Sequence, residues 1–386
     1  MFHVKHKSGD LKRNQGDCTG QNINFGESDT PLYNSIGLRL CYSREIDESK
    51  DASNVFHCRK GTDMSSTTPI KEFRLELSDL TYTGHDLVRP ESIIAQPNGT
   101  LLVSDGRGGI TRINPDGRQD FLGGLGGEPN GIALMDDGSI LVANIAVGGI
   151  QKLHPDGRVE DFLTEVDGVK LTTANYVFMD SKQRIWMAFS TRESIWWPAA
   201  AHPRPDGYIV LLDEKGPRIV RDDIYFTNEI HLDANEEYLY VAETMKNHII
   251  RFRVQPDGSL SDKESVGPDN LGIGAAVDGF TFDADGNIWV TTVLRNGVGI
   301  ITPDGDYHIV FEEANDPLLT TFEQKIADGQ AQPADMAATV GKTLQLVTSV
   351  TFGGPDLQTV YVGSLGMSRL PTFRSPVAGL ALHHWK

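Results

Sequence analysis

The sequence predicts an all-β fold, a six-bladed β-propeller, from three observations: a repeated segment, the turn residues inside each copy, and the spacing of the copies. Each copy reads as an apolar strand, a tight turn and a second apolar strand. The copies begin at Glu91, Asn130, Asn175, Asn228, Asp278 and Thr348, with gaps of 39, 45, 53, 50 and 70 residues. Periods of about 40 to 50 residues with four short strands each are typical of propeller blades.

The turn residues indicate that each copy is a hairpin extended by further strands. Segments such as QPNGTL, MDDGSI and DADGNI place Asn or Asp before Gly between two apolar runs. A Pro-Asp-Gly turn then follows the third run in INPDGR, LHPDGR and ITPDGD. Such pairs supply the positive-φ residue that a tight hairpin needs.

The chain before the first copy divides into two parts. Residues 1–68 are polar and lack sustained periodicity, so we expect a poorly ordered N-terminal extension. The propeller is expected to occupy residues 69–386. The alternating segment from Ile70 to Leu77 is predicted to be the strand that completes the last blade and closes the ring.

Two insertions interrupt the repeat. Residues 191–205 contain SIWWPAAAHPRP and lie between the second and third strands of the third blade. Residues 312–342 precede the sixth copy and include a helical stretch. Loops on a rigid scaffold commonly carry specificity. Trp196 and Trp197 are interpreted either as a local packing cluster or as a lid over a ligand.

Composition excludes several classes of partner. The formal net charge is −18, and phosphate binding needs clustered Lys and Arg, so nucleic acid and anionic membranes are not expected as partners. The three cysteines fit no common zinc motif. No apolar run approaches the roughly 20 residues of a membrane span. We expect a cytoplasmic protein, a monomer or a dimer, that acts on a small molecule.

The first residue of each copy carries the chemistry that the fold predicts. In a propeller the first strand of each blade lines the central channel, so equivalent positions converge near one mouth. Five of the six positions hold a carboxylate or a carboxamide, the sixth being Thr348. Oxygen ligands without thiols or imidazoles suit a hard divalent cation.

A structural interpretation of the same residues competes with this one. Asn and Asp are common turn formers, and Asn130 before Gly131 fits a hairpin corner. Turn formation explains Asn175 and Asn228 less well, since no glycine follows either residue. It also does not explain Glu91, because Glu is a weak turn former. The residues taken together favour a metal site.

Three segments carry a resemblance to a known family. TNEIHLDANEEYLYVAET, VDGFTFDADGNIWVTT and VTSVTFGGPDLQTVYVGS, with its Phe-Gly-Gly-Pro-Asp run, resemble successive blades of the senescence-marker-protein/gluconolactonase/luciferin-regenerating-enzyme family. The resemblance covers roughly residues 85–370. It implies a six-bladed propeller that binds one divalent cation and hydrolyses lactones, and related propellers hydrolyse organophosphates.

The resemblance also implies roles for individual residues. Glu91, Asn228 and Asp278 match the family's metal-binding positions, and Asn175 falls where the family has an asparagine that touches metal or substrate. Ca²⁺ is the preferred ion, with Zn²⁺, Mn²⁺ or Mg²⁺ as alternatives. Sugar-acid lactonases of the family carry an arginine where this chain has Thr173, so a simple sugar-acid lactone is not expected as the substrate.

The expected substrate is therefore more apolar or aromatic, in contact with Asn130, Thr173, Trp196 and Trp197. A bound cation would polarise its carbonyl. Asp278 is the candidate general base for the attacking water, or the direct nucleophile, with Asn175 beside it at the reacting centre.

Two histidines are weaker candidates. Strand alternation is expected to turn His231 away from the channel, so we interpret it as a histidine packed between blades. His202, in the first insertion, is a minor candidate for proton transfer. No Gly-x-Ser-x-Gly segment occurs, which argues against a serine hydrolase.

Two other functions remain open on this scaffold. One is a non-catalytic propeller that binds a small molecule, with a purely structural cation. The other is a non-hydrolytic enzyme, a lyase or isomerase, since fold does not determine function. Strictosidine-synthase-like propellers illustrate this second alternative, and hydrolysis of phosphotriesters is also compatible with the cation.

Overall fold

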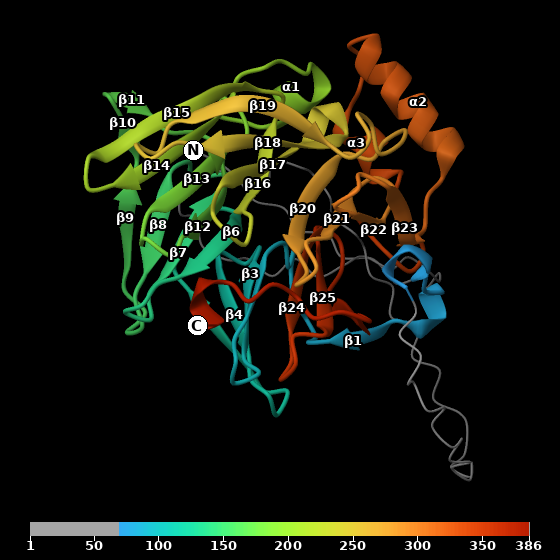
Figure 1. Ribbon diagram of the computed structural model, residues 1–386, viewed down its shortest axis with the longest axis horizontal. Coiled ribbons are helices and arrows are strands. Elements are labelled where there is room, and N and C mark those ends of the chain that lie inside the picture. The colour runs from blue at the N-terminus through green and yellow to red at the C-terminus, as the bar shows by residue number, and fades with distance from the viewer. Residues whose placement is uncertain (1–68, 386) are drawn as a thin grey trace, which may run out of the picture. The chain divides into compact units, whose positions relative to one another are not determined.

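The computed structural model describes residues 69–385 (Figure 1). Six four-stranded antiparallel sheets form the blades of a β-propeller, as the repeat predicts. The predicted N-terminal extension, residues 1–68, lies outside the described residues. No helix between residues 69 and 385 is both long and apolar enough to cross a membrane.

The first five blades each use four consecutive main strands, starting from the channel. Blade one holds β2 (Ile93–Ala95), β3 (Leu101–Asp105), β4 (Gly109–Ile113) and β5 (Gln119–Gly123). Blade two holds β6 (Pro129–Leu134), β7 (Ile140–Asn144), β8 (Ile150–Leu153) and β9 (Val159–Leu163). Blade three holds β12 (Ala174–Met179), β13 (Ile185–Phe189), β14 (Gly207–Asp213) and β15 (Gly216–Ile224). Blade four holds β16 (Thr227–Leu232), β17 (Tyr238–Glu243), β18 (His248–Val254) and β19 (Leu260–Val266). Blade five holds β20 (Val277–Phe282), β21 (Ile288–Thr292), β22 (Gly297–Ile301) and β23 (Tyr307–Glu312).

Short elements connect the blades. A small hairpin, β10 (Glu165–Val166) and β11 (Val169–Lys170), precedes blade three. The predicted insertions form α1 (Trp197–Ala201), and α2 (Asp316–Ala327) with α3 (Pro333–Ala337). The remaining helices are single 3₁₀ turns: η1 (Ile70–Glu72), η2 (Leu77–Asp79), η3 (Thr244–Lys246) and η4 (His383–Trp385).

Blade six joins the two ends of the propeller. It holds β24 (Val347–Gly353), β25 (Thr359–Ser364) and β26 (Leu370–Arg374), and β1 (Thr81–Thr83) pairs with β26 as its outer strand. Figure 1 shows β1, in blue, beside the red strands of this blade. The early segment therefore closes the ring, as predicted, but the strand lies later than expected.

The prediction of a strand from Ile70 to Leu77 is wrong for a physical reason. The apolar side chains of this segment, those of Ile70, Phe73, Leu75 and Leu77, pack against the core cluster that surrounds Trp289. Leu75 lies outside the named strands, and its N–H donates to Val310 O of β23 at 2.9 Å. The alternation in the sequence thus reflects burial against the blades rather than pairing within a sheet.

Most of the core lies between adjacent blades and contains a recurring polar contact. Trp186 of blade three and Trp289 of blade five are completely buried. Each indole Nε1–H donates to an aspartate six residues earlier, Asp180 at 2.9 Å and Asp283 at 3.0 Å. These aspartates end their inner strands and also accept backbone N–H groups of the following turn. One carboxylate therefore links the hairpin turn to the interior of the blade.

The inner strands carry a second recurring feature, an irregular start. Register shifts that mark β-bulges occur near the first residues of β6, β12, β16, β20 and β24. A bulge inserts an extra residue and interrupts the alternation of side chains. Both Asn228 and Glu229 consequently face the channel, and so does His231. His231 packs between blades as expected, with its ring 5.9 Å from that of Phe178 in blade three and 5.0 Å from that of Phe280 in blade five. It also lines the channel, which was not expected, because the bulge interrupts the alternation.

We predict that Asp283→Ala lowers the free energy of unfolding by about 1–3 kcal/mol, because it leaves the Trp289 and Asn287 donors buried without an acceptor. Urea unfolding measures the change. Asp285→Ala, an exposed residue of the same turn, is the control and should stay within about 0.5 kcal/mol of the parent. Equal stability of the two variants would contradict the role given to Asp283.

Candidate metal centre

One mouth of the channel opens into a cavity of about 340 Å³, which we call the first cavity. Its polar residues include all four predicted metal ligands and Asn130. The predicted ligands come from different blades: Glu91 precedes β2, and Asn175, Asn228 and Asp278 are each the second residue of β12, β16 and β20. All four are at most 8% exposed. The structure thus brings together residues spread over 188 positions of the chain, from 91 to 278.

Each of these four side chains has one buried oxygen with no hydrogen-bond partner in the described part of the chain. The atoms are Glu91 Oε2, Asn175 Oδ1, Asn228 Oδ1 and Asp278 Oδ1. A buried polar atom without a partner is costly, and a buried charge more so. Four such oxygens at one mouth therefore fit a cation that would accept them as ligands.

Neighbouring hydroxyl groups set the direction of the two amides. Asn228 Nδ2 donates to Thr244 Oγ1 at 3.2 Å, and that hydroxyl donates to Val277 O at 2.7 Å. The hydroxyl hydrogen is thus already used, and only the amide nitrogen of Asn228 can face it. Asn175 Nδ2 donates to Ser190 Oγ at 3.0 Å. In both residues the amide oxygen is left without a protein partner.

The donor set favours a hard cation. It comprises two carboxylates and two carboxamides, the groups that Ca²⁺ accepts in proteins. Among residues 69–385, no cluster of three or more His, Cys, Asp and Glu side chains is placed to hold a metal ion. Binding at this mouth would therefore depend on the amide oxygens as much as on the carboxylates.

Burial and mutual repulsion hold the carboxyl groups in an unfavourable environment. Burial raises the pKa of Glu91 to about 8, although the Arg89 guanidinium lowers it. Burial also raises the pKa of Asp278 well above its usual range, and the Glu91 and Glu229 carboxylates raise it further. The pKa of Glu229, next in sequence to Asn228, is raised to about 8 by burial. A divalent cation would relieve this concentration of negative charge.

Asn130 differs from the other two asparagines because both ends of its amide are occupied. Its Nδ2 donates to Asn175 O at 3.0 Å, and its Oδ1 accepts from Arg89 Nη2 at 2.7 Å. It therefore organises the neighbouring blades while lining the cavity.

Arg89 is a functional candidate that the sequence analysis missed. Its side chain lines the first cavity, and its Nη1 donates to Pro129 O at 3.1 Å. It adopts a φ of 47°, a strained value for a non-glycine residue, directly before Pro90. In the sequence, the indication that Arg89 lies near the site was its position two residues before Glu91.

The insertions supply the apolar walls of the first cavity. Trp196 and Trp197 line it, with ring centroids 5.6 Å apart, and they also pack against a core cluster that includes Leu319 and Phe322 of α2. The tryptophan pair is therefore a packing cluster that also forms part of the cavity wall, and its role as a lid over a ligand stays a prediction. In Figure 1, α2 is the orange helix at the upper right, outside the blade strands. Its residues Phe322, Glu323, Ile326 and Ala327 contribute to the wall.

Three residues singled out in the sequence lie elsewhere. Thr173 is buried outside the cavity lining, and its hydroxyl donates to Thr191 O at 2.7 Å. Thr348 donates from its hydroxyl to Glu91 O at 3.0 Å, which links blade six to blade one. His202 is exposed and is not among the lining residues of the first cavity.

Comparisons with known proteins agree with the fold. A 6-deoxy-6-sulfogluconolactonase of Pseudomonas putida is 24% identical over 260 residues, which cover 67% of this chain and 76% of that protein. The protein STRICTOSIDINE SYNTHASE-LIKE 4 of Arabidopsis thaliana is 22% identical over 174 residues, 44% of this chain and 45% of that protein. The alignment therefore spans less than half of this second relative.

Solved structures show the same architecture. A gluconolactonase of Xanthomonas campestris superposes with a TM-score of 0.56 at 19% identity, over 77% of this chain and 91% of that one. A calcium-binding protein of Agrobacterium tumefaciens, regucalcin, superposes with a TM-score of 0.57 at 16% identity, over 78% and 96%. The family model described as the SMP-30/gluconolactonase/LRE-like region matches residues 89–315, which is more than half of the chain. The protein belongs to the SMP-30/gluconolactonase/LRE-like family.

Proposed function

We propose that this protein is a divalent-metal-dependent hydrolase that opens a lactone or a related ester in the first cavity. One observation carries the proposal. Four buried oxygens, on Glu91, Asn175, Asn228 and Asp278, lack a hydrogen-bond partner among the described residues, and all four residues line the same cavity. Membership of a family with lactonases among its relatives supports the same chemistry. Ca²⁺ is the ion we favour, because all the donors are oxygen atoms.

The walls of the cavity indicate the kind of substrate. Apolar and aromatic side chains, among them Trp196, Trp197, Phe226 and Phe322, surround the polar mouth. Such a pocket favours an acyl or aryl group over a polyhydroxylated ring. The carbonyl of the substrate would then face the carboxylates, with its apolar part against the tryptophan pair. A simple sugar-acid lactone is not the substrate we propose.

Different residues of the chain have different roles in the proposed reaction. When bound, a divalent cation would polarise the substrate carbonyl and stabilise negative charge on its oxygen. The Asp278 carboxylate accepts a proton from the attacking water, or in the alternative attacks the carbonyl itself. Asn175, which lines the same cavity, would act together with Asp278 at the reacting centre. Arg89 holds Asn130, and so keeps the first two blades in place around the site.

The first test measures hydrolysis of aliphatic lactones and aryl esters by protein stripped of metal with a chelator. Ca²⁺, Mg²⁺, Mn²⁺ and Zn²⁺ are then added back separately. We expect one ion to restore activity, which identifies the cofactor. Metal binding without turnover of any substrate would overturn the proposal and favour a binding propeller or a non-hydrolytic enzyme.

We predict that metal-free protein becomes less stable as the pH rises from about 4.5 to about 8. Over this range the folded protein holds more protons than the unfolded chain, because the pKa of Glu91 is raised to about 8 from an ordinary 4.5. The free energy of unfolding then falls with pH, by an amount on the order of a few kcal/mol. Urea unfolding at four pH values, with and without saturating Ca²⁺, measures the slope.

Bound Ca²⁺ should reduce this dependence, since the cation keeps Glu91 and Asp278 ionised in the folded state. Glu229, whose pKa is also raised to about 8, keeps its own contribution. The stabilisation by Ca²⁺ therefore grows with pH between 5 and 8. The same slope with and without Ca²⁺ would show that the ion does not bind at Glu91 and Asp278.

We predict that Asp278→Asn lowers kcat/KM by about 10² to 10⁴-fold while the far-UV circular dichroism stays that of the parent, because the amide cannot accept the proton. Asp285→Asn, exposed in the same blade, serves as the matched control and should keep full activity. Turnover of the Asp278→Asn variant near the parent rate would exclude Asp278 as base and as nucleophile.

A further inference from the structure

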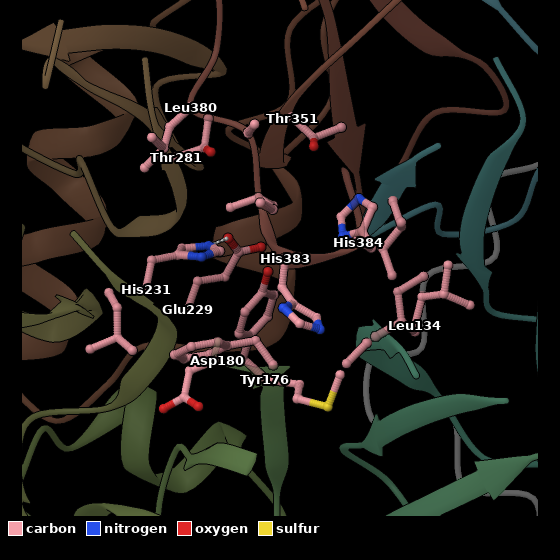
Figure 2. Close-up of a pocket in the computed structure, with 18 of the residues that line it drawn as sticks. Leu134, Tyr176, Asp180, Glu229, His231, Thr281, Thr351, Leu380, His383 and His384 are labelled. Atoms are coloured by element: carbon pink, nitrogen blue, oxygen red, sulfur yellow. Dashed lines mark hydrogen bonds and ion pairs between the residues drawn. The ribbon is translucent and has the colours of Figure 1, made fainter. Parts of the chain in front are cut away.

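A second cavity, of about 130 Å³, lies further along the same inner strands, and none of its lining residues lines the first cavity. Its walls include Tyr176, Glu229, His231 and Ser349. Figure 2 shows the side chains of Tyr176, Glu229, His231, His383 and His384 around this space. Nothing in the proposed hydrolysis uses it.

The charges that line the second cavity have one sign. Four acidic residues contribute to it, Asp180, Glu229, Asp233 and Glu236, and neither lysine nor arginine is among its lining residues. Asp180 is neutralised by Arg184, whose Nε lies 2.6 Å from its Oδ2. Asp233 and Glu236 are less buried and accept backbone N–H groups. Glu229 accepts the Phe280 N–H at 3.2 Å, and it is the acidic group inside this cavity that has neither lysine nor arginine beside it among the described residues.

Glu229 contrasts with a second buried Glu–His pair in the same blade. Glu243 lies 2.7 Å from His248 and 3.2 Å from Lys263, so a lysine balances its charge. Glu229 lies 3.4 Å from His231, and within 4.0 Å of it the described residues offer no lysine or arginine. His231 does not supply the charge, because burial lowers its pKa to about 3. Because burial raises the pKa of Glu229 to about 8, a cationic partner from outside the chain would stabilise the ionised form of this carboxyl group.

A buried hydroxyl group without a hydrogen-bond partner among the described residues belongs to the lining of the same cavity. Ser349 is 4% exposed and lines the cavity, and its Oγ has no hydrogen-bond partner among the described residues. Gly279 lets it approach Glu229: a Cβ on this glycine would lie 2.7 Å from Glu229 Oε1 and 2.7 Å from Ser349 Cα. The Glu229 carboxylate and the Ser349 backbone thus meet at Gly279, from blades four and six, and both residues line the same cavity.

The remaining walls favour an organic cation over a bare metal ion. Ile94, Ile132, Leu134 and Phe178 line the cavity, and these side chains offer a metal ion no ligands. The Tyr176 ring lies 5.1 Å from the His231 ring, edge to face, and aromatic rings of this kind attract cations. Neither lysine nor arginine is present among the lining residues to attract an anion. The volume suits a molecule of about six non-hydrogen atoms.

The end of the chain covers this cavity. Leu380 N–H donates to Phe282 O at 2.9 Å, and His384 Nε2 lies 3.0 Å from Ala95 O. Residues 380–384 therefore bridge blades five and one across the mouth of the channel, and all five contribute to the lining. A ligand beneath this segment would be shielded from solvent.

We propose that the second cavity binds a small organic ammonium ion, with its N–H groups donating to the Glu229 carboxylate and the Ser349 hydroxyl and its hydrocarbon part against Ile94, Ile132 and Leu134. The site is separate from the proposed metal centre. It is a ligand site of its own and not part of the hydrolytic machinery.

Isothermal titration calorimetry of the full chain with saturating Ca²⁺ tests this proposal. The probe is cyclopentylammonium, and cyclopentanol is its neutral counterpart of the same size. We expect the ammonium ion to bind and the alcohol not to bind. Equal binding of the two, or no binding of the ammonium ion, would overturn the proposal. So would displacement of the ammonium ion by additional Ca²⁺ or by K⁺ at equal ionic strength, because the site would then be one for metal ions.

Variants locate the binding. Glu229→Gln should weaken it by at least about tenfold, as expected for loss of a hydrogen bond to a charged group. Ser349→Ala removes a hydroxyl that makes no hydrogen bond in the protein, so it should fold normally and weaken binding by about three- to tenfold. Glu237→Gln, an exposed residue outside the cavity lining, makes the same charge change as a control and should not alter binding. Unchanged binding in the Ser349→Ala and Glu229→Gln variants would place the ammonium ion elsewhere.

Discussion

The closure of six sheets into one ring is the constraint on which the rest of this structure depends. β1 pairs with β26, which joins the early part of the propeller to its last blade. Thr348 of blade six donates to the backbone of Glu91 in blade one. The contact between the last and the first blade therefore also lies next to the candidate metal centre. Ring closure is what makes equivalent positions of the repeat neighbours in space. Without it, the carboxylates and amides at the first mouth would belong to separate hairpins.

Bulges at the start of the inner strands then determine what the channel contains. Regular alternation would send every second side chain into the packing between blades. The extra residue in each bulge allows consecutive residues, such as Asn228 and Glu229, to face the channel, one toward each cavity. The result is a column of acidic groups in one channel: Glu91 and Asp278 at one cavity, and Glu229 at the other. Burial, together with repulsion from Glu91 and Glu229, raises the pKa of Asp278, and this repulsion is a physical reason to expect cations at this axis.

The two cavities differ because different parts of the chain enclose them. The first cavity is walled by long connections on one face of the propeller, where α1 and α2 bring tryptophan and phenylalanine side chains. The second is covered by the last residues of the described chain, which also bond to inner strands of two blades. In both cavities the repeated strands supply the polar lining residues. The segments outside the repeat supply the walls that would determine which ligand fits.

The number of blades and their order could be predicted from the sequence, because the repeat recurs at a blade-like period. The four candidate ligands could be named as well, because the first position of the repeat is polar in each copy. It also located both insertions. Which polar residues lie close together depends on the tertiary structure. The bulges could not be seen in a pattern of period two, so Glu229 and His231 were not expected in the channel. Arg89 and the C-terminal segment reach their cavities through contacts between distant blades, and Ile70–Leu77 alternates because it packs on the outer core. The local sequence pattern shows which face of a segment is buried. The segment that packs against this face depends on how the ring closes.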